Sequence, residues 1–174
     1  MSIVHLQERI TDDLEKFESF KRSDASKVYC IPKDIEPFVI VLKLGDQYAS
    51  HVNRGEAKMY SIDHEGIKIP PGGSVVVEVQ QIIYVPFNMY GFIIQKGSAF
   101  LEEGIMVSAG KVDPSFSGKL QVLLFNSSKR KQLIKKGEAI ANLIFIRTDS
   151  TMGSPMFKEP QLAKSRNKGF AEKI

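Results

Sequence analysis

Hydrophobic residues recur at steps of three and four near the start of the chain, and in short continuous or alternating runs after about residue 38. The first pattern is carried by Ile3, Leu6, Ile10, Leu14 and Phe17. Steps of this size place side chains on one face of a helix. We therefore expect a helix over about residues 3–20 whose apolar stripe packs against the rest of the domain.

The later runs are rich in β-branched residues and end in Gly, Pro or Asn turns, as short β-strands do. They cover residues 38–44, 66–69, 74–79, 82–85, 90–95, 119–125 and 139–146. Strands of this length and spacing indicate a sandwich or barrel rather than alternating strands and helices. The sequence therefore predicts a single, mainly β domain over residues 1–148. We interpret residues 149–174, which are polar and rich in Ser and Lys, as a mobile C-terminal tail.

The composition narrows the class of protein. With 174 residues, 43% hydrophobic and 25% charged, the chain is long enough to build one hydrophobic core. No apolar run approaches the roughly 20 residues needed to cross a bilayer, and the polar N-terminus does not resemble a signal peptide. One cysteine, Cys30, and three histidines form no metal-ligand pattern. We expect a cytoplasmic protein without a metal site or membrane contact of its own.

The formal net charge of the chain is +4, and basic residues gather at 129–136 and in the tail. This charge suits an anionic ligand such as a phosphate, although a solvated turn and terminus explain it as well. No helix-turn-helix pattern and no array of aromatic and basic residues accompanies it, so we do not expect nucleic-acid binding.

Three stretches of the chain carry motifs in a fixed order: Lys96–Ile105, Val112–Gly118 and Lys136–Ile144. They resemble, respectively, the Arg-Ser motif with its helical turn, the Ile-Asp-Pro-Gly-aromatic-x-Gly hairpin and the Gly-x-x-Ile-Ala-Gln-Leu strand of the dUTPase/dCTP-deaminase superfamily. A fainter match, Val41–Tyr48, together with the leading helix and Ser165-Arg166, is similar to the dCTP deaminase branch.

The resemblance implies a distorted β-barrel or jelly roll that assembles as a homotrimer with its sites between subunits. In that family the Arg-Ser motif of one chain meets the phosphates, and the hairpin of another meets the pyrimidine. We therefore expect a nucleotide or a related phosphate as the ligand. Mg²⁺ would be carried by the ligand phosphates, and no cofactor would be bound by the protein alone.

Asp113 stands at the position of the family's catalytic Asp, which positions and activates water. Asp before Pro is also an ordinary turn pair, so a scaffold role remains open. The other residues expected to contact the ligand are Lys96, Gly97, Ser98, Lys111, Phe116, Gly118 and Asn142. The resemblance implies that Phe116 packs against deoxyribose, although it could equally be a core aromatic.

Several positions depart from the family pattern. Lys96 replaces an Arg and loses its bidentate fork, Gly97 lacks a hydroxyl, and Asn142 is one methylene shorter than the usual Gln. The proton-transferring Glu of the deaminases aligns with Leu123, and their supporting Arg aligns with Leu101. Leucine cannot move a proton, which argues against deamination.

These departures lead us to expect a catalytically degenerate nucleotide-binding homotrimer that sequesters or senses a nucleotide, or regulates a partner. One alternative is a divergent enzyme, either a dUTPase-like nucleoside triphosphate pyrophosphatase that uses Asp113 or a dCTP deaminase. The other is a structural or interaction module in which Leu101 and Leu123 fill the former site.

Overall fold

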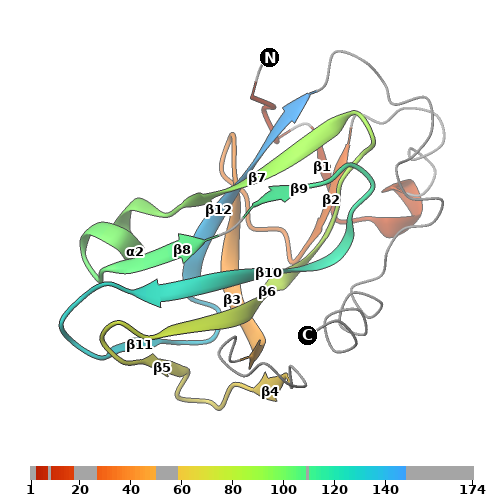
Figure 1. The fold of residues 1–174 in the computed structure, drawn as a ribbon. Helices are drawn as coiled ribbons and strands as arrows, with labels where there is room; N and C mark the ends of the chain where they lie inside the picture. The colour runs from red at the N-terminus through yellow and green to blue at the C-terminus, as the bar shows by residue number, and fades with distance from the viewer. Residues whose placement is uncertain (1–2, 8, 18–26, 50–58, 109, 148–174) are drawn as a thin grey trace.

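The structure is a computed structural model, and it describes residues 3–7, 9–17, 27–49, 59–108 and 110–147 (Figure 1). Strands dominate these residues, while helix is confined to α2 (Gly97–Leu101) and to residues 14–17. The expected mainly β fold is therefore confirmed. The expected tail at 149–174 lies outside the described residues.

Among the described helices, none has both the length and the apolar character needed to cross a bilayer.

Most strands belong to one bent, ten-stranded sheet, and two further strands form a small separate ribbon. The strands are β1 (Ile10–Thr11), β2 (Val28–Ile31), β3 (Ile40–Ala49), β4 (Tyr60–Ser61), β5 (Ile67–Ile69), β6 (Ser74–Tyr84), β7 (Met89–Gln95), β8 (Ile105–Ser108), β9 (Lys111–Val112), β10 (Ser117–Asn126), β11 (Gln132–Ile134) and β12 (Ala139–Arg147). The main path of the sheet is β1-β2-β6-β3-β12-β7-β9. Strand β10 lies beside β6, β8 beside β10, β4 beside β3, and β5 pairs with β11.

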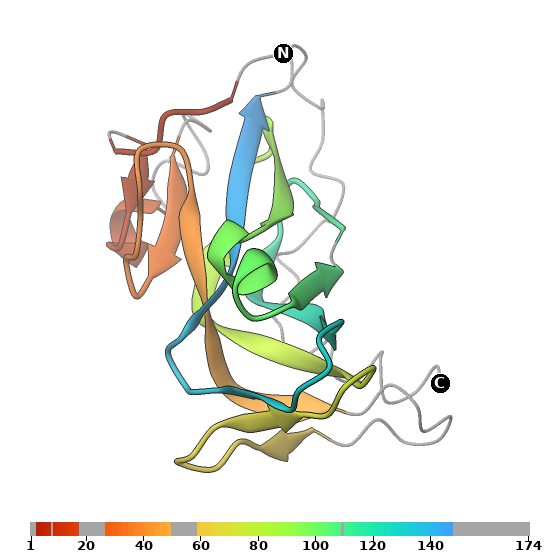
Figure 2. The same cartoon turned by 90° about the vertical axis from the view of Figure 1, so that its left-hand side faces the viewer.

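Strand β3 joins the two halves of the sheet because it changes partner along its length. Its first residues pair with β12, and its last residues pair with β6. Near the change, the buried side chain of Gln81 donates to Val41 O at 2.9 Å and accepts from Lys43 N at 3.1 Å. A Cβ at Gly45 would lie 2.7 Å from Glu78 O, so the strands approach this closely only because residue 45 is a glycine. Figure 2 shows β3 running the length of the molecule.

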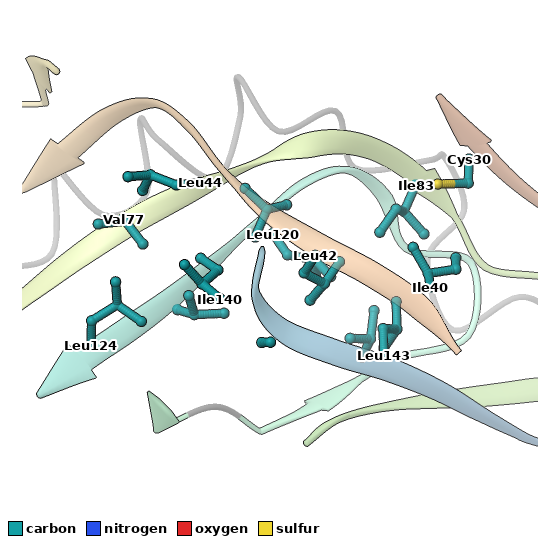
Figure 3. Packing of buried hydrophobic residues seen from close by; sticks show 14 of the residues in the cluster. Cys30, Ile40, Leu42, Leu44, Val77, Ile83, Leu120, Leu124, Ile140 and Leu143 are labelled. Atoms are coloured by element: carbon teal, nitrogen blue, oxygen red, sulfur yellow. The ribbon is translucent and has the colours of Figure 1, made fainter. Parts of the chain in front are cut away.

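The core lies between the two halves of the sheet and is filled by alternate residues of the long strands. Strand β6 contributes Val75, Val77, Val79 and Ile83, all 7% exposed or less. Leu120, Val122 and Leu124 of β10 meet them, together with residues of β3 and β12 such as Leu42 and Leu143 (Figure 3). Each such side chain contributes about 1.5–3 kcal/mol by leaving water. The strand period of two therefore produces one continuous core.

The N-terminal segment differs from the helix expected over residues 3–20. Ile3 makes an isolated bridge with Ile146, β1 pairs in parallel with β2, and of the described residues only 14–17 are helical. Leu6 and Ile10 are nevertheless buried, at 0% and 7% exposed, outside any helix. The Phe17 ring, at the end of the short helical stretch, packs against Tyr29 and Tyr84. Pairing with the sheet satisfies backbone groups here, as when Val4 N donates to Phe145 O at 2.9 Å. The expected long helix is wrong over residues 3–13, and residues 18–20 lie outside the described part.

Candidate functional site

Lys96, Gly97 and Ser98 lie at the junction where β7 ends and α2 begins (Figure 1). Lys96 is partly buried, and the two residues after it are exposed. The helical turn has no side-chain cap, and Lys96 O accepts a hydrogen bond from Phe100 N at 3.2 Å. Nothing lies within 4 Å of the place where a Cβ of Gly97 would be. The segment therefore presents a lysine and open backbone to its surroundings.

Asp113 directly follows β9 and faces Lys111, two residues earlier. Lys111 Nζ lies 2.5 Å from Asp113 Oδ1, and the side chains are 54% and 20% exposed, respectively. The ammonium group also lies 5.4 Å from the centre of the Tyr90 ring. The hydrogen bond to Asp113 raises the pKa of Lys111, and the negative charge of that carboxylate acts in the same direction. The carboxylate of Asp113 is thus held beside a cation and stays partly open to solvent.

The turn after Asp113 has a backbone that glycine would adopt more easily. Ser115 has a φ of 66° at the position where the family motif has Gly, and Gly118 has a φ of 133°. The turn is tied to the end of β6 because Ser115 N donates to Val85 O, and Val85 N donates to Phe116 O, each at 2.9 Å. These bonds fix where the hairpin projects Asp113.

Phe116 is 4% exposed and belongs to the hydrophobic core of the chain. The structure thus places its ring among core side chains, which supports the interpretation of Phe116 as a core aromatic. Contact of this ring with a deoxyribose stays a prediction, because little of its surface is open within one chain.

Asn142 lies on β12 between Val41 of β3 and Ile94 of β7. Its Oδ1 is buried and accepts no hydrogen bond from the described residues. A buried amide oxygen without a donor is costly, so a partner from outside the chain would stabilise it. The residue lies one strand away from the Lys96 segment, since Ile94 is two positions before Lys96.

Within one chain, Asn142 lies near the Lys96 segment, but the hairpin that carries Asp113 does not. Lys111 lies over Tyr90, which is six residues before Lys96 along β7. At about 3.3 Å per residue, the two parts of the expected site are separated by about 20 Å along the strand. Within one chain, Asp113 therefore lies near the Tyr90 end of β7, and the Lys96 segment lies at the other end.

The alternative of a filled-in site requires Leu101 and Leu123 to pack into former pocket space. Leu101 is 80% exposed in the single chain, so it packs into no pocket of its own chain. Leu123 is partly buried on β10, opposite Ser108 and Val76. Neither residue closes the segment that carries Lys96.

The donor set of the site does not form a metal cage. Among the described residues, no three His, Cys, Asp or Glu side chains are gathered where they could hold an ion. The carboxylate of Asp113 is engaged by Lys111, and the phosphate-side candidate Lys96 is itself a cation. The residues present therefore fit Mg²⁺ only if phosphate oxygens of a ligand supply most of its contacts.

No sequence motif points to Tyr90, which the fold brings beside Lys111. Ser115 could have been noticed, because it stands where the family motif has Gly, and the structure explains that Gly by the positive φ. No motif points to Gln95 either, at the end of β7.

Comparison with known proteins gives a consistent family. A family model described as dUTPase matches residues 62–171. A protein of Saccharomyces cerevisiae named deoxyuridine 5'-triphosphate nucleotidohydrolase is 33% identical over 109 residues, which are 61% of this chain and 74% of that protein. A protein of the same name from Paramecium bursaria Chlorella virus 1 is 36% identical over 80 residues, 46% of this chain and 57% of that protein.

A solved structure shares the fold. It is that of the 2'-deoxycytidine 5'-triphosphate deaminase from Agrobacterium tumefaciens, which is 12% identical with a TM-score of 0.57. The match covers 82% of this chain and 46% of that chain. At this identity the likeness concerns the fold alone, so it does not favour the deaminase branch.

The interpretation of the chain as a catalytically degenerate binder is wrong. Relatives about one third identical over most of its β domain are named nucleotidohydrolases, and the loss of deaminase side chains does not bear on that chemistry. With the family model spanning 62–171, the chain belongs to the dUTPase family.

Proposed function

We propose that this chain is a dUTP pyrophosphatase, which hydrolyses dUTP to dUMP and pyrophosphate. The observation that carries the proposal is the retained hairpin carboxylate: Asp113 is 20% exposed at a strand end, beside a lysine, in a chain of the dUTPase family. A carboxylate in this setting can accept a proton from water. The water oxygen then bonds to the α-phosphorus, the bond from that phosphorus to the bridging oxygen breaks, and pyrophosphate leaves.

The phosphate side of the proposed site is the segment Lys96–Ser98. Lys96 supplies one positive charge, and the backbone of Gly97 and the hydroxyl of Ser98 lie on the exposed side of the junction. A lysine meets phosphate as a point charge rather than through the two parallel bonds of an arginine. Mg²⁺, when bound through the ligand phosphates, would neutralise charge on the leaving pyrophosphate.

We further propose that the working unit is a homotrimer. The separation between the Tyr90 end of β7 and Lys96 supports this, because a single chain holds the two halves of the site apart. Apolar residues exposed on β7, Phe92 at 38% and Ile94 at 39%, also favour burial against another chain. Analytical ultracentrifugation should give three times the 19.5 kDa chain mass. A monomeric mass in an active preparation would rule out the trimer.

The test of the activity compares the wild type with Asp113→Asn, at saturating dUTP and Mg²⁺, by pyrophosphate release. Losing the proton acceptor should lower kcat by at least about 100-fold. The matched control is Asp46→Asn, since Asp46 is a 71% exposed carboxylate that also pairs with a lysine, Lys136, at 3.6 Å. If Asp113→Asn turns over as fast as the control, Asp113 is not the base. If the wild type releases no pyrophosphate from dUTP, the proposed function is wrong.

Deamination of dCTP is not proposed for this chain. Leu123, at the position of the deaminase Glu, has no group that transfers protons. The leading helix that is similar to the deaminase branch is also absent over residues 3–13.

A further inference from the structure

Gln95, the last residue of β7, directs its whole side-chain amide at the main chain around α2. Its Nε2 donates to Lys96 O at 3.2 Å and to Ile105 O at 3.0 Å, and its Oε1 accepts from Val107 N at 2.7 Å. The side chain is partly buried. Both donors of the amide and one lone pair of its acceptor are therefore used at this place.

The amide joins two strands that no ladder joins. Within the described residues, β7 pairs with β12 and β9, whereas β8 pairs with β10. The chain leaves β7 at Gln95, passes through α2 and returns as β8 (Figure 1). Gln95 bonds both Ile105 O and Val107 N, as a neighbouring strand would do. Its side chain therefore links the two ends of the β7–α2–β8 segment.

The bond to Lys96 O fixes more than one carbonyl group. Lys96 O accepts from Gln95 Nε2 and from Phe100 N, each at 3.2 Å. Because the peptide unit is planar, holding this carbonyl also holds the N–H of Gly97 on the opposite side of the same plane. Gly97 is otherwise the residue with the largest backbone freedom in the segment. The orientation of the Lys96–Gly97 peptide is thus held jointly by Gln95 and by the helical bond from Phe100 N.

We propose that Gln95 is a positioning residue for the phosphate-binding segment Lys96–Ser98. The inference rests on the proposed function, since it assigns to that segment the β- and γ-phosphates of dUTP. Gln95 touches neither the phosphates nor the water held by Asp113. It acts by presenting the Lys96 side chain and the Gly97 N–H in one fixed geometry, which lowers the cost of ordering them around the ligand.

The test compares Gln95→Leu with a matched control, Gln132→Leu. Gln132 is also a partly buried glutamine. Its Nε2 donates to Glu103 O, just after α2, at 2.6 Å and to Ser128 Oγ at 3.1 Å. Both changes keep side-chain bulk and remove bonds to the α2 region. Only the first removes a hydrogen bond from the Lys96–Gly97 peptide.

We expect Gln95→Leu to raise KM for dUTP about tenfold while kcat stays within about twofold, because one well-placed set of phosphate contacts is loosened. The inhibition constant of dUMP, which lacks the β- and γ-phosphates, should change by less than about twofold. Gln132→Leu should leave both constants at the wild-type values. Hydrogen exchange of amides 97–101 should be faster in Gln95→Leu than in Gln132→Leu, and this readout does not depend on turnover.

Gln95→Glu serves if the leucine variant does not fold. The carboxylate is nearly isosteric and still accepts from Val107 N, but it cannot donate to Lys96 O or Ile105 O, so it should reproduce the KM effect. Equal KM values for the Gln95 and Gln132 variants, in an active wild-type background, would overturn the positioning role and leave the proposed function standing. A wild-type chain that does not hydrolyse dUTP would instead remove the proposed function and this inference together, before any variant is compared.

Discussion

Lys111 donates a hydrogen bond from Nζ to Asp113 Oδ1 across 2.5 Å, and the pair lies beside the ring of Tyr90. Lys111 and Asp113 are two positions apart at the end of the edge strand β9. Their side chains therefore point to the same face of the sheet. An exposed ion pair of this kind contributes little to folding. Its effect is instead local, because it restricts the rotamers of the carboxylate that the proposed mechanism uses.

Replacing Lys111 by Met should therefore affect turnover more than folding. We expect kcat for dUTP to fall about tenfold, because the carboxylate of Asp113 loses the cation that orients it, and Lys111→Arg should keep most of the activity. Steady-state pyrophosphate release measures both. Lys68→Met is the matched control, since Lys68 forms a similar exposed pair with Glu65 at 2.6 Å, far along the chain from the site. The same kcat in the Lys111→Met and Lys68→Met variants would mean that the pair has no role in catalysis.

The Lys111–Asp113 pair also has a defined pH range. Since its pKa is raised by the bond to Asp113, Lys111 stays charged below its ordinary value of 10.5 and loses the proton only above it. We expect the kcat difference between the wild type and Lys111→Met to be constant from pH 7 to 9 and to shrink when the pH rises past the raised pKa. A difference that already vanishes near pH 8 would contradict this assignment.

Gly97 and Lys96 offer a gain-of-function test. No atom lies within 4 Å of a Cβ placed on Gly97, and its φ is not in the left-handed region, so Gly97→Ser should fold normally. The double variant Lys96→Arg with Gly97→Ser gives the segment the Arg and Ser of the family motif. We expect KM for dUTP to fall about three- to tenfold, because a bidentate fork and a hydroxyl are added. An unchanged or higher KM would mean that this segment does not bind the phosphates.

Asn126 is a buried polar residue that hydrogen-bonds three main-chain groups around it. It is 0% exposed, its Nδ2 donates to Ile69 O at 2.9 Å and to Arg130 O at 2.7 Å, and its Oδ1 accepts from Ser128 N at 2.9 Å. Asn126→Leu would remove these three hydrogen bonds to the main chain, leaving Ser128 Oγ as a donor to Arg130 O. We expect a loss of about 2–4 kcal/mol in the free energy of unfolding, measured by urea titration. Ser127→Ala, at an exposed neighbouring position, should lose less than about 1 kcal/mol. Equal losses for the two variants would count against this network.

The strands were predictable where one face of each is buried and where a Gly, Pro or Asn turn ends the run. Residues 90–95 and 139–146 were expected as strands, and β7 and β12 occupy 89–95 and 139–147. The predicted break between 74–79 and 82–85 is absent, because the buried Gln81 continues β6 by bonding the backbone of β3. A polar residue at a buried strand position suggests the end of the strand when its hydrogen-bond partner lies about 40 positions away in the sequence.

The N-terminal segment shows the opposite failure. The apolar residues have a helical spacing, but β1 pairs with β2 at the edge of the sheet. This tertiary pairing outweighs the local helical pattern. Leu14, one of the five residues of the pattern, is 43% exposed. The site was partly predictable, because Asp113 and Lys96 stand in motifs. The Lys111–Tyr90 contact and the amide of Gln95 depend on strand register and on side-chain rotamers, which no spacing reveals.

Cys30 links burial to the stability of the fold at alkaline pH. The residue is 0% exposed, its Sγ donates to Pro32 O at 3.4 Å, and burial raises the pKa of the thiol from 9.0 to about 12. In the unfolded chain the thiol ionises near its ordinary value, so the folded state binds the proton more tightly. The resulting stabilisation is complete below about pH 8.5 and is lost as the pH rises toward the folded-state pKa.

We therefore expect the free energy of unfolding of the wild type to fall more steeply with pH than that of Cys30→Ala, by up to about 1.4 kcal/mol per pH unit between pH 9 and 11. Urea titrations of both chains at each pH measure this slope. The void left by alanine costs the same at every pH, so it does not affect the difference in slope. Native wild type should also react with a thiol reagent only after denaturant is added. Parallel pH profiles for the two chains would show that the thiol is not protected by the fold.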